Sequence, residues 1–163
     1  MDIYRKLMAD ERVIYLMKGT LVGLSAGFIV SLFRWGIEFI LETVIEGYHF
    51  MQEQPIWLIP WVIFSVTAAL IVGKLVKSEP NIKGSGIPQV EGQVQGLISL
   101  NWWPVIWKKF IGGLLAIGSG LFLGREGPSI QLGSAVGQGI SNLTKGDDVE
   151  EKILLSSGAG AGV

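Results

Sequence analysis

Long apolar runs dominate the chain, and they predict helices that cross a membrane. Residues 13–45 follow a helical pattern, which at about 1.5 Å per residue exceeds the roughly 30 Å hydrocarbon core, so we expect this helix to tilt. A polar turn at 47–55 separates it from a second span at 57–76. Residues 1–12 place apolar side chains at helical spacing among polar ones, which predicts a short helix on the membrane surface.

The first span carries two local patterns. Gly19, Gly23 and Gly27 recur every fourth residue, so we expect another helix to approach this face closely. Arg34 and Glu38 have the spacing of an ion pair along one helix. A structural pair is the favoured interpretation, and a place in a transport path is the alternative.

Two helices begin with a proline and are too short to cross a bilayer. One opens at Pro88 and stops before Gly96, and the other runs from Pro128 to about Leu143. Non-helical backbone at membrane depth is tolerated only where protein buries it or where it lines a watery cavity. Paired interrupted helices are typical of transporter ion sites, and helix N-termini attract anions. The pattern therefore predicts a cavity that holds an anion.

The composition agrees with a membrane protein and excludes several functional classes. Hydrophobic residues make up 49% of the 163, glycine accounts for 23, and mean hydropathy is +0.47. A net charge of -1 gives no basis for binding nucleic acid. The chain has no cysteine, and His49 is its single histidine, so thiolate or histidine metal sites and Ser-His catalysis have no residues to build on. We expect no metal and no cofactor.

Basic residues set the expected orientation. They flank the start of the first span and the end of the second, whereas the turn at 47–55 has none. By the positive-inside rule, the N-terminus is cytoplasmic and that turn lies outside. The expected protein is a multi-pass integral protein of the cell membrane. The basic residues that support this are Arg5, Lys6, Arg12, Lys18, Lys74, Lys77 and Lys83.

The polar run 145–152 is typical of a solvated connector. Asp147 or Asp148 can cap a helix that begins near Val149. We do not expect this acidic pair to bind a metal, because further ligands are missing.

Two pentapeptides carry a resemblance to a known family. Gly-Ser-Gly-Ile-Pro at 84–88 and Gly-Arg-Glu-Gly-Pro at 124–128, joined by a segment with Lys-Lys-Phe-Ile-Gly-Gly at 108–113, closely resemble the signature of the CLC chloride channels and chloride/proton antiporters. Either pentapeptide alone is weak evidence, whereas both in this order and in an apolar setting are strong. The resemblance implies an all-α integral membrane fold with tilted and broken helices, of which residues 1–163 form the N-terminal part of an inverted repeat.

The resemblance also implies which residues bind chloride. A neutral hydroxyl, as on Ser85, and backbone N–H groups can replace water around chloride without trapping it. Ser85 has an alternative role, as a cap on the helix that opens at Ile87. The implied chloride-binding residues are Gly84, Ser85, Gly86, Ile87, Arg125, Glu126 and Gly127, and the selectivity motifs also contain Pro88, Gly124 and Pro128.

Glu126 corresponds to the gating and proton-transfer glutamate of the family. A carboxylate at a helix N-terminus can take the place of the anion, and protonation removes this competition. The alternative is a capping residue paired with Arg125. We expect the Arg125 side chain to anchor the loop by pairing with Glu91, because an intramembrane charge needs compensation. Lys109 corresponds to the basic residue under the ion path, where it raises the positive potential.

The expected function is chloride transport across a lipid bilayer, by H+/Cl- exchange or by passive conduction. The resemblance implies a homodimer for the complete protein. It also implies a second inverted half, with a tyrosine across from the serine, that these residues lack, so we expect a fragment that does not transport alone. A non-transporting membrane scaffold is the alternative. An enzyme is not expected, because the apolar segments offer no carboxylate cluster or nucleophile–base pair.

Overall fold

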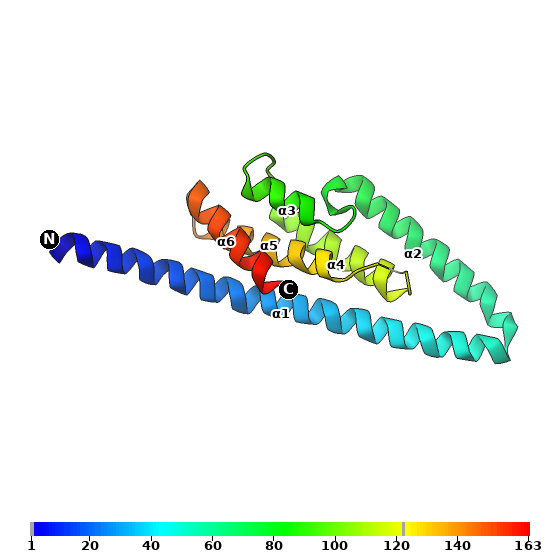
Figure 1. Ribbon diagram of the computed structural model, residues 1–163. Helices are drawn as coiled ribbons and strands as arrows, with labels where there is room; N and C mark the ends of the chain where they lie inside the picture. The colour runs from blue at the N-terminus through cyan, green and yellow to red at the C-terminus, as the bar shows by residue number, and fades with distance from the viewer. Residues whose placement is uncertain (1, 122) are drawn as a thin grey trace.

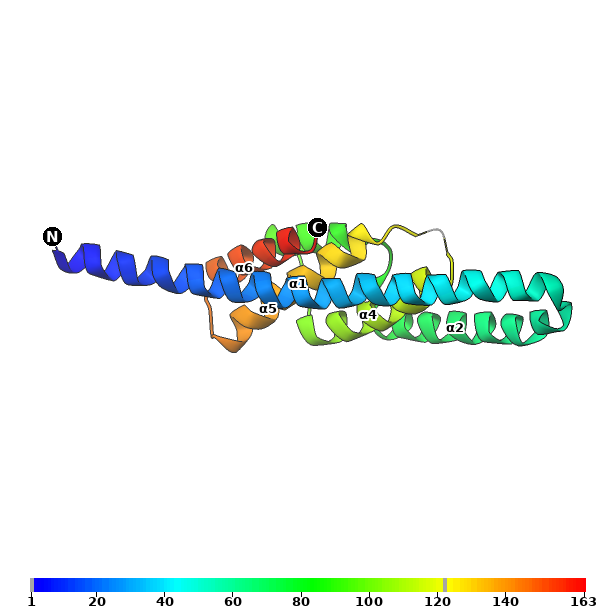
Figure 2. The same cartoon turned by 90° about the horizontal axis from the view of Figure 1, so that it is seen from below.

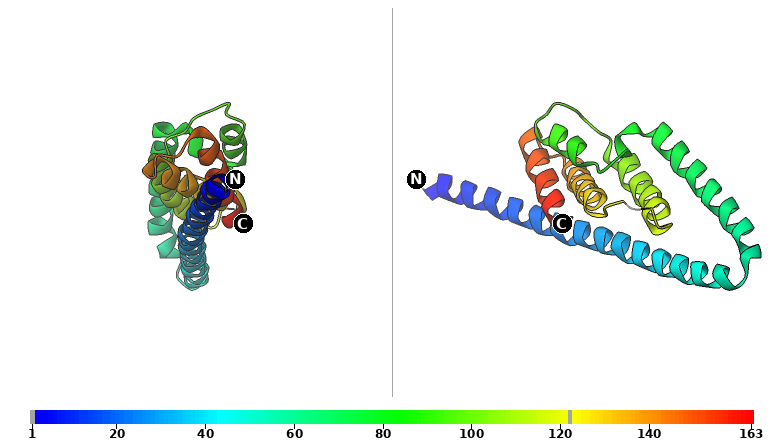
Figure 3. Two further views of the ribbon diagram at one scale, coloured as in Figure 1. Left: turned by 90° about the vertical axis from the view of Figure 1, so that its left-hand side faces the viewer. Right: turned by 45° about the vertical axis from the view of Figure 1, so that its right-hand side comes forward.

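Six helices and two short turns make up the part of the chain described by the computed structural model, which covers residues 2–121 and 123–163. The longest helix, α1, extends along the whole molecule, α2 folds back from its far end, and the shorter helices lie against its middle (Figures 1 and 3). The elements are α1 (Asp2–Glu53), a 3-10 turn (Pro55–Trp57), α2 (Leu58–Ser78), a 3-10 turn (Pro80–Ile82), α3 (Ile87–Val94), α4 (Trp102–Gly118), α5 (Glu126–Leu143) and α6 (Asp148–Ala161).

Helix α1 is longer at both ends than the sequence predicted. The backbone of residues 2–12 continues into the first span without a break, so the separate short helix is wrong, whereas its place on a membrane surface stays a prediction. No glycine or proline precedes Gly19, and so nothing interrupts the helix. The expected turn at 47–55 is also shorter, because the helix persists to Glu53 and the chain reverses only at Pro55.

Two stretches, Val13–Glu53 and Pro55–Ser78, are long and apolar enough to cross a membrane by length and composition. Of the most apolar 18-residue segment, only 17% is buried in the first stretch and 6% in the second. A core helix of a soluble protein would not leave so much apolar surface exposed. Leu24, Phe28 and Leu70 are among the large apolar side chains left exposed along them. We therefore treat these helices as membrane-spanning, with lipid covering the exposed side chains.

The close helix contact predicted for α1 occurs elsewhere. A Cβ atom at Gly19, Gly23 or Gly27 would meet nothing within 4 Å in the described part of the chain, so the expected partner helix is absent from this face. Glycines instead bring α5 against α6. A Cβ atom at Gly133 would collide with the backbone of Gly158, and one at Gly158 would collide with the backbone of Gly133.

Helix α5 lies at the centre of the fold, and residues 127–129 and 131–139 are all buried. Leu132 of α5 packs with Phe33 and Ile37 of α1 and with Ile117 of α4 in one apolar cluster. Burying each such side chain contributes about 1.5–3 kcal/mol. Figure 2 shows α1 crossing the group formed by α4, α5 and α6. This packing fixes the N-terminus of α5 relative to the other helices.

Candidate functional site

The two pentapeptides meet in space. A Cβ atom at Gly127 would lie 2.6 Å from the Cβ and 2.8 Å from the backbone oxygen of Ser85, so only glycine allows the two segments to approach this closely. Gly127 and Pro128 are buried, whereas Ser85 is exposed and lines a cavity. The start of α5 and the loop before α3 therefore form one structure.

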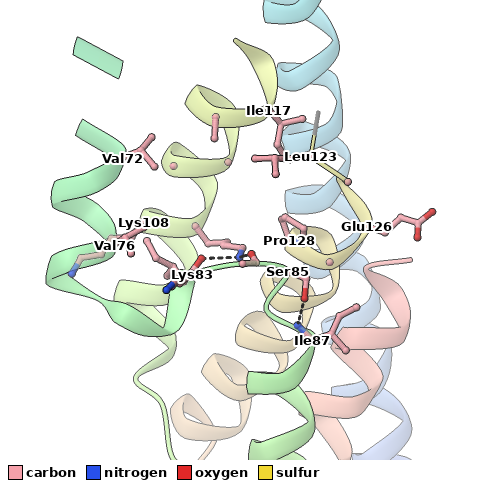
Figure 4. Close-up of a pocket in the computed structure, with 18 residues that line it drawn as sticks. Val72, Val76, Lys83, Ser85, Ile87, Lys108, Ile117, Leu123, Glu126 and Pro128 are labelled. Carbon is pink, nitrogen blue, oxygen red and sulfur yellow. Dashed lines mark hydrogen bonds between the residues drawn. The ribbon is translucent and has the colours of Figure 1, made fainter. Parts of the chain in front are cut away.

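A cavity of about 500 Å³ lies between this joined structure and helices α2 and α4. Figure 4 shows the labelled side chains around it. Gly86 and Arg125 do not line it, although the resemblance placed them with the chloride-binding residues. From the pentapeptides, the lining residues are Gly84, Ser85, Ile87, Gly124, Glu126, Gly127 and Pro128.

The loop before α3 has a backbone that glycine permits. Gly84 has a φ of 71° and Gly86 a φ of 89°, both in the left-handed region that residues with a Cβ atom avoid. Ser85 Oγ accepts a hydrogen bond of 3.3 Å from the backbone N–H of Ile87 (Figure 4). This bond closes a short turn in front of α3, but the N-cap residue of the helix is Gly86, so Ser85 is not its N-cap. The helix has 8 residues with proline in its first turn, which agrees with the predicted short helix.

Lys109 of α4 forms hydrogen bonds with the backbone of this loop. Its side chain is buried, and Nζ donates hydrogen bonds of 2.9 Å to the backbone oxygen of Ile82 and 2.7 Å to that of Gly84. These bonds compensate an ammonium that would be costly to bury alone. No peptide bond of the described residues is cis, and in a trans peptide the N–H points opposite to the C=O. The N–H of Ser85 is therefore directed away from Lys109.

Glu126 begins α5 at the rim of the cavity. It lies in the first turn of the helix, and its side chain is exposed. Figure 4 shows its carboxylate directed away from Ser85.

Arg125 anchors its loop, but the expected partner is wrong. Its Nη1 atom lies 2.6 Å from Oε1 of Glu38 on α1, and both side chains are about half exposed. Glu91 is exposed on α3 and forms no ion pair within the described residues. The reason is that α1 passes beside the N-terminus of α5, which the sequence alone does not reveal.

The predicted pair of Arg34 and Glu38 is also wrong, since Glu38 binds Arg125. Arg34 Nη2 instead donates to the backbone oxygens of Val163, at 2.6 Å, and Gly162, at 3.4 Å. These oxygens lie at the C-terminal end of α6, where the helix dipole favours a cation. Both arginines therefore connect α1 to other helices.

Two buried glutamines of α5 escaped the sequence analysis. Gln131 Nε2 donates to the backbone oxygen of Asn81 at 2.8 Å. Gln138 Nε2 donates to the backbone oxygen of Leu100 at 2.9 Å and to Oε1 of Glu151 at 3.0 Å. The sequence did contain a signal for them, because each is a polar side chain inside a glycine-rich apolar helix. A polar side chain that is buried needs a hydrogen-bond partner.

Residues 68–163, which include both pentapeptides, match the model of a family described as voltage gated chloride channels. The chain belongs to this family. It is 36% identical over 149 residues to the H(+)/Cl(-) exchange transporter ClcA of Vibrio parahaemolyticus, across 89% of this chain and 32% of the relative. It is 32% identical over 167 residues to ClcA of Cronobacter sakazakii, across 99% of this chain and 36% of the relative.

The fold agrees with the same family. The structure superposes on a slow cyanobacterial Cl-/H+ antiporter with a TM-score of 0.83 and 33% identity, across 91% of this chain and 35% of that protein. The all-α CLC fold that the motifs predicted is therefore confirmed. The chain spans about a third of the length of these CLC relatives.

Proposed function

We propose that this CLC chain forms part of a chloride transport path, with the anion held between the N-terminal ends of α3 and α5. The observation that carries this proposal is the contact between Ser85 and Gly127 beside a cavity that both pentapeptides line. Because each helix N-terminus carries roughly half a positive charge, two such ends beside one cavity favour an anion.

The groups around the cavity suit a halide better than a cation. Glu126 is the one carboxylate among the lining residues, whereas Lys83, Lys108 and Lys109 add positive charge. The Ser85 hydroxyl and the backbone N–H groups of the loop offer neutral hydrogen-bond donors, which release the ion more readily than a full ion pair does.

Glu126 acts as the gate in this proposal. Rotation about its side-chain bonds brings the carboxylate to the N-terminus of α5, where it competes with chloride for the same place. When the carboxylate takes up a proton it loses its charge, and chloride then regains the site. This competition links proton movement to chloride movement.

Exchange is favoured over passive conduction because the relatives are named as H(+)/Cl(-) exchange transporters. The proposal includes a cell-membrane location with a cytoplasmic N-terminus and homodimeric assembly of the complete protein. Since the chain spans about a third of these relatives, we also propose that residues 1–163 alone do not transport chloride. Liposomes that contain only these residues and release chloride would contradict this last point.

The test uses the native protein, expressed from its complete reading frame and reconstituted into chloride-loaded liposomes. Chloride efflux and proton uptake are recorded together after a potassium ionophore is added. We expect the wild type to move both ions and Glu126→Gln to move chloride without protons. Glu42→Gln is the matched control, because Glu42 is an exposed carboxylate on α1 that does not line the cavity. A wild type without chloride flux would refute the function, and proton coupling in Glu126→Gln would refute the gate.

A further inference from the structure

Gln131 connects the start of α5 to the loop before α3 through a buried hydrogen bond. Its side chain is 1% exposed, and Nε2 donates to the backbone oxygen of Asn81 at 2.8 Å. Asn81 lies in the 3-10 turn Pro80–Ile82, which leads directly into residues 84–88. Gln131 follows Glu126 on the same helix, so a shift of the first turns of α5 would move both residues.

The same side chain also supports the loop at a second point. A Cβ atom at Gly86 would lie 2.6 Å from the amide carbon of Gln131 and 2.7 Å from its Cβ. Gly86 therefore rests directly on Gln131, and its positive φ and lack of a Cβ make this approach possible. Gln131 thus touches the loop before and after Ser85.

The amide of Gln131 has one allowed orientation. The backbone oxygen of Asn81 only accepts hydrogen bonds, so the NH₂ group of Gln131 must face it. If the amide were flipped, Oε1 would face the Asn81 oxygen, and neither atom could donate. Oε1 is then left buried beside Gly86, without a hydrogen-bond partner in the described part of the chain. A buried polar atom without a partner is uncommon and needs an explanation.

Lys109 of α4 holds the same loop. It binds the backbone oxygens of Ile82 and Gly84, while Gln131 binds that of Asn81. Three carbonyl groups that lead into the Ser85 site are therefore held by side chains from α4 and α5. Because α5 carries both Glu126 and Gln131, any shift of its first turns reaches the loop through Gln131.

We propose that Gln131 is a positioning residue, which couples the position of the α5 N-terminus to the anion affinity of the Ser85 loop. The proposal rests on the function proposed above. The loop before α3 keeps the orientation that binds chloride only while the Gln131 amide is hydrogen-bonded to Asn81 and packs against Gly86. Gln131 itself does not line the cavity.

The chain offers a matched control. Gln138 is 3% exposed on the same helix, and its amide binds Leu100, Glu151 and, near the C-terminal end of α3, Gln93, but it binds neither pentapeptide. Gln131→Met and Gln138→Met each keep the side-chain volume and remove one buried amide donor. We expect a larger loss of thermal stability for Gln138→Met, because the Gln138 side chain makes three hydrogen bonds and that of Gln131 makes one. An effect on chloride affinity that is confined to Gln131→Met then cannot come from general destabilisation.

The experiment measures chloride binding to the native protein in detergent by isothermal titration calorimetry with potassium chloride. A lost hydrogen bond of typical strength predicts binding about fivefold weaker for Gln131→Met, with wild-type affinity for Gln138→Met. Gln131→Asn supplies a second test, because its shorter amide cannot reach both Asn81 and Gly86, and we expect the same loss. Equal affinities in the Gln131 and Gln138 variants would overturn the positioning role. A wild type that binds no chloride would instead overturn the proposed function.

Discussion

Ser85 and Gly127 lie in van der Waals contact, although one precedes α3 and the other lies in the first turn of α5. This contact requires glycine at 127. It joins two helix N-termini into one structure beside the cavity.

Gly127→Ala is therefore expected to separate these two segments. The added Cβ atom would lie 2.6 Å from the Cβ of Ser85 and 2.8 Å from its backbone oxygen, and the backbone cannot yield as a flexible side chain can. Overpacking of this kind costs about 1–3 kcal/mol of unfolding free energy. Thermal unfolding of the native protein and of the variant measures the loss.

Gly47→Ala is the control for that experiment. A Cβ atom at Gly47 meets nothing within 4 Å, and Gly47 lies inside α1. Alanine is a better helix former than glycine, so a neutral or slightly stabilising effect is expected. Equal destabilisation at the two positions would mean that the contact with Ser85 is not what requires glycine at 127.

Lys109→Met is expected to weaken chloride binding. The ammonium donates to the backbone oxygens of Ile82 and Gly84, and hydrogen bonds to charged groups contribute about 1.5–3 kcal/mol. Without them the Gly84 carbonyl can turn, and the Ser85 N–H on the same peptide turns with it. Calorimetric titration with potassium chloride measures the change.

Lys108→Met separates this positioning effect from simple loss of charge. Lys108 is adjacent in sequence and also lines the cavity, but its Nζ donates to the backbone oxygen of Ser78 and lies over the Trp107 ring instead of holding the loop. We expect a smaller and more salt-sensitive effect than for Lys109→Met. Identical losses in the two variants would favour a purely electrostatic role for Lys109.

The sequence predicted the short helices well because their ends are encoded locally. Pro88 and Pro128 each occupy a first turn, and the glycines before α3 supply backbone angles that other residues avoid. Asp147 caps α6 as expected, accepting a 2.7 Å hydrogen bond from the backbone N–H of Glu150. Such features depend on neighbours within a few residues, so a single sequence contains them.

The partners of charged side chains could not be predicted in the same way. The spacing of Arg34 and Glu38 indicated a pair along α1, yet each binds a residue next to the end of another helix, Val163 after α6 and Arg125 before α5. Which cation reaches which acceptor depends on how α1 crosses α5 and α6. The role of Gln131 was missed for the same reason, because its partner Asn81 comes from a distant segment.

The two ion pairs found among the described side chains are expected to differ in strength. Lys18 Nζ lies 2.6 Å from Oε1 of Glu150, and their side chains are only 19% and 10% exposed. Arg125 and Glu38 are also 2.6 Å apart, but they are 49% and 57% exposed. Double-mutant cycles with neutral replacements should give a coupling of about 1.5–3 kcal/mol for the first pair and at most about 1 kcal/mol for the second. Equal couplings would show that solvent exposure does not decide their strength.

The orientation of α2 can be tested by cysteine labelling, because residues 1–163 contain no cysteine and any cysteine elsewhere in the native protein can be replaced by serine. The helix has 21 residues, which at about 1.5 Å each span the hydrocarbon core, and lysines cluster at its C-terminal end. The positive-inside rule then places Gln54 outside and Ser78 in the cytoplasm. A membrane-impermeant maleimide should label Gln54→Cys in intact cells, and Ser78→Cys only after permeabilisation. Labelling of both positions in intact cells would mean that α2 does not cross the bilayer, and the cavity beside it would then not lie at membrane depth.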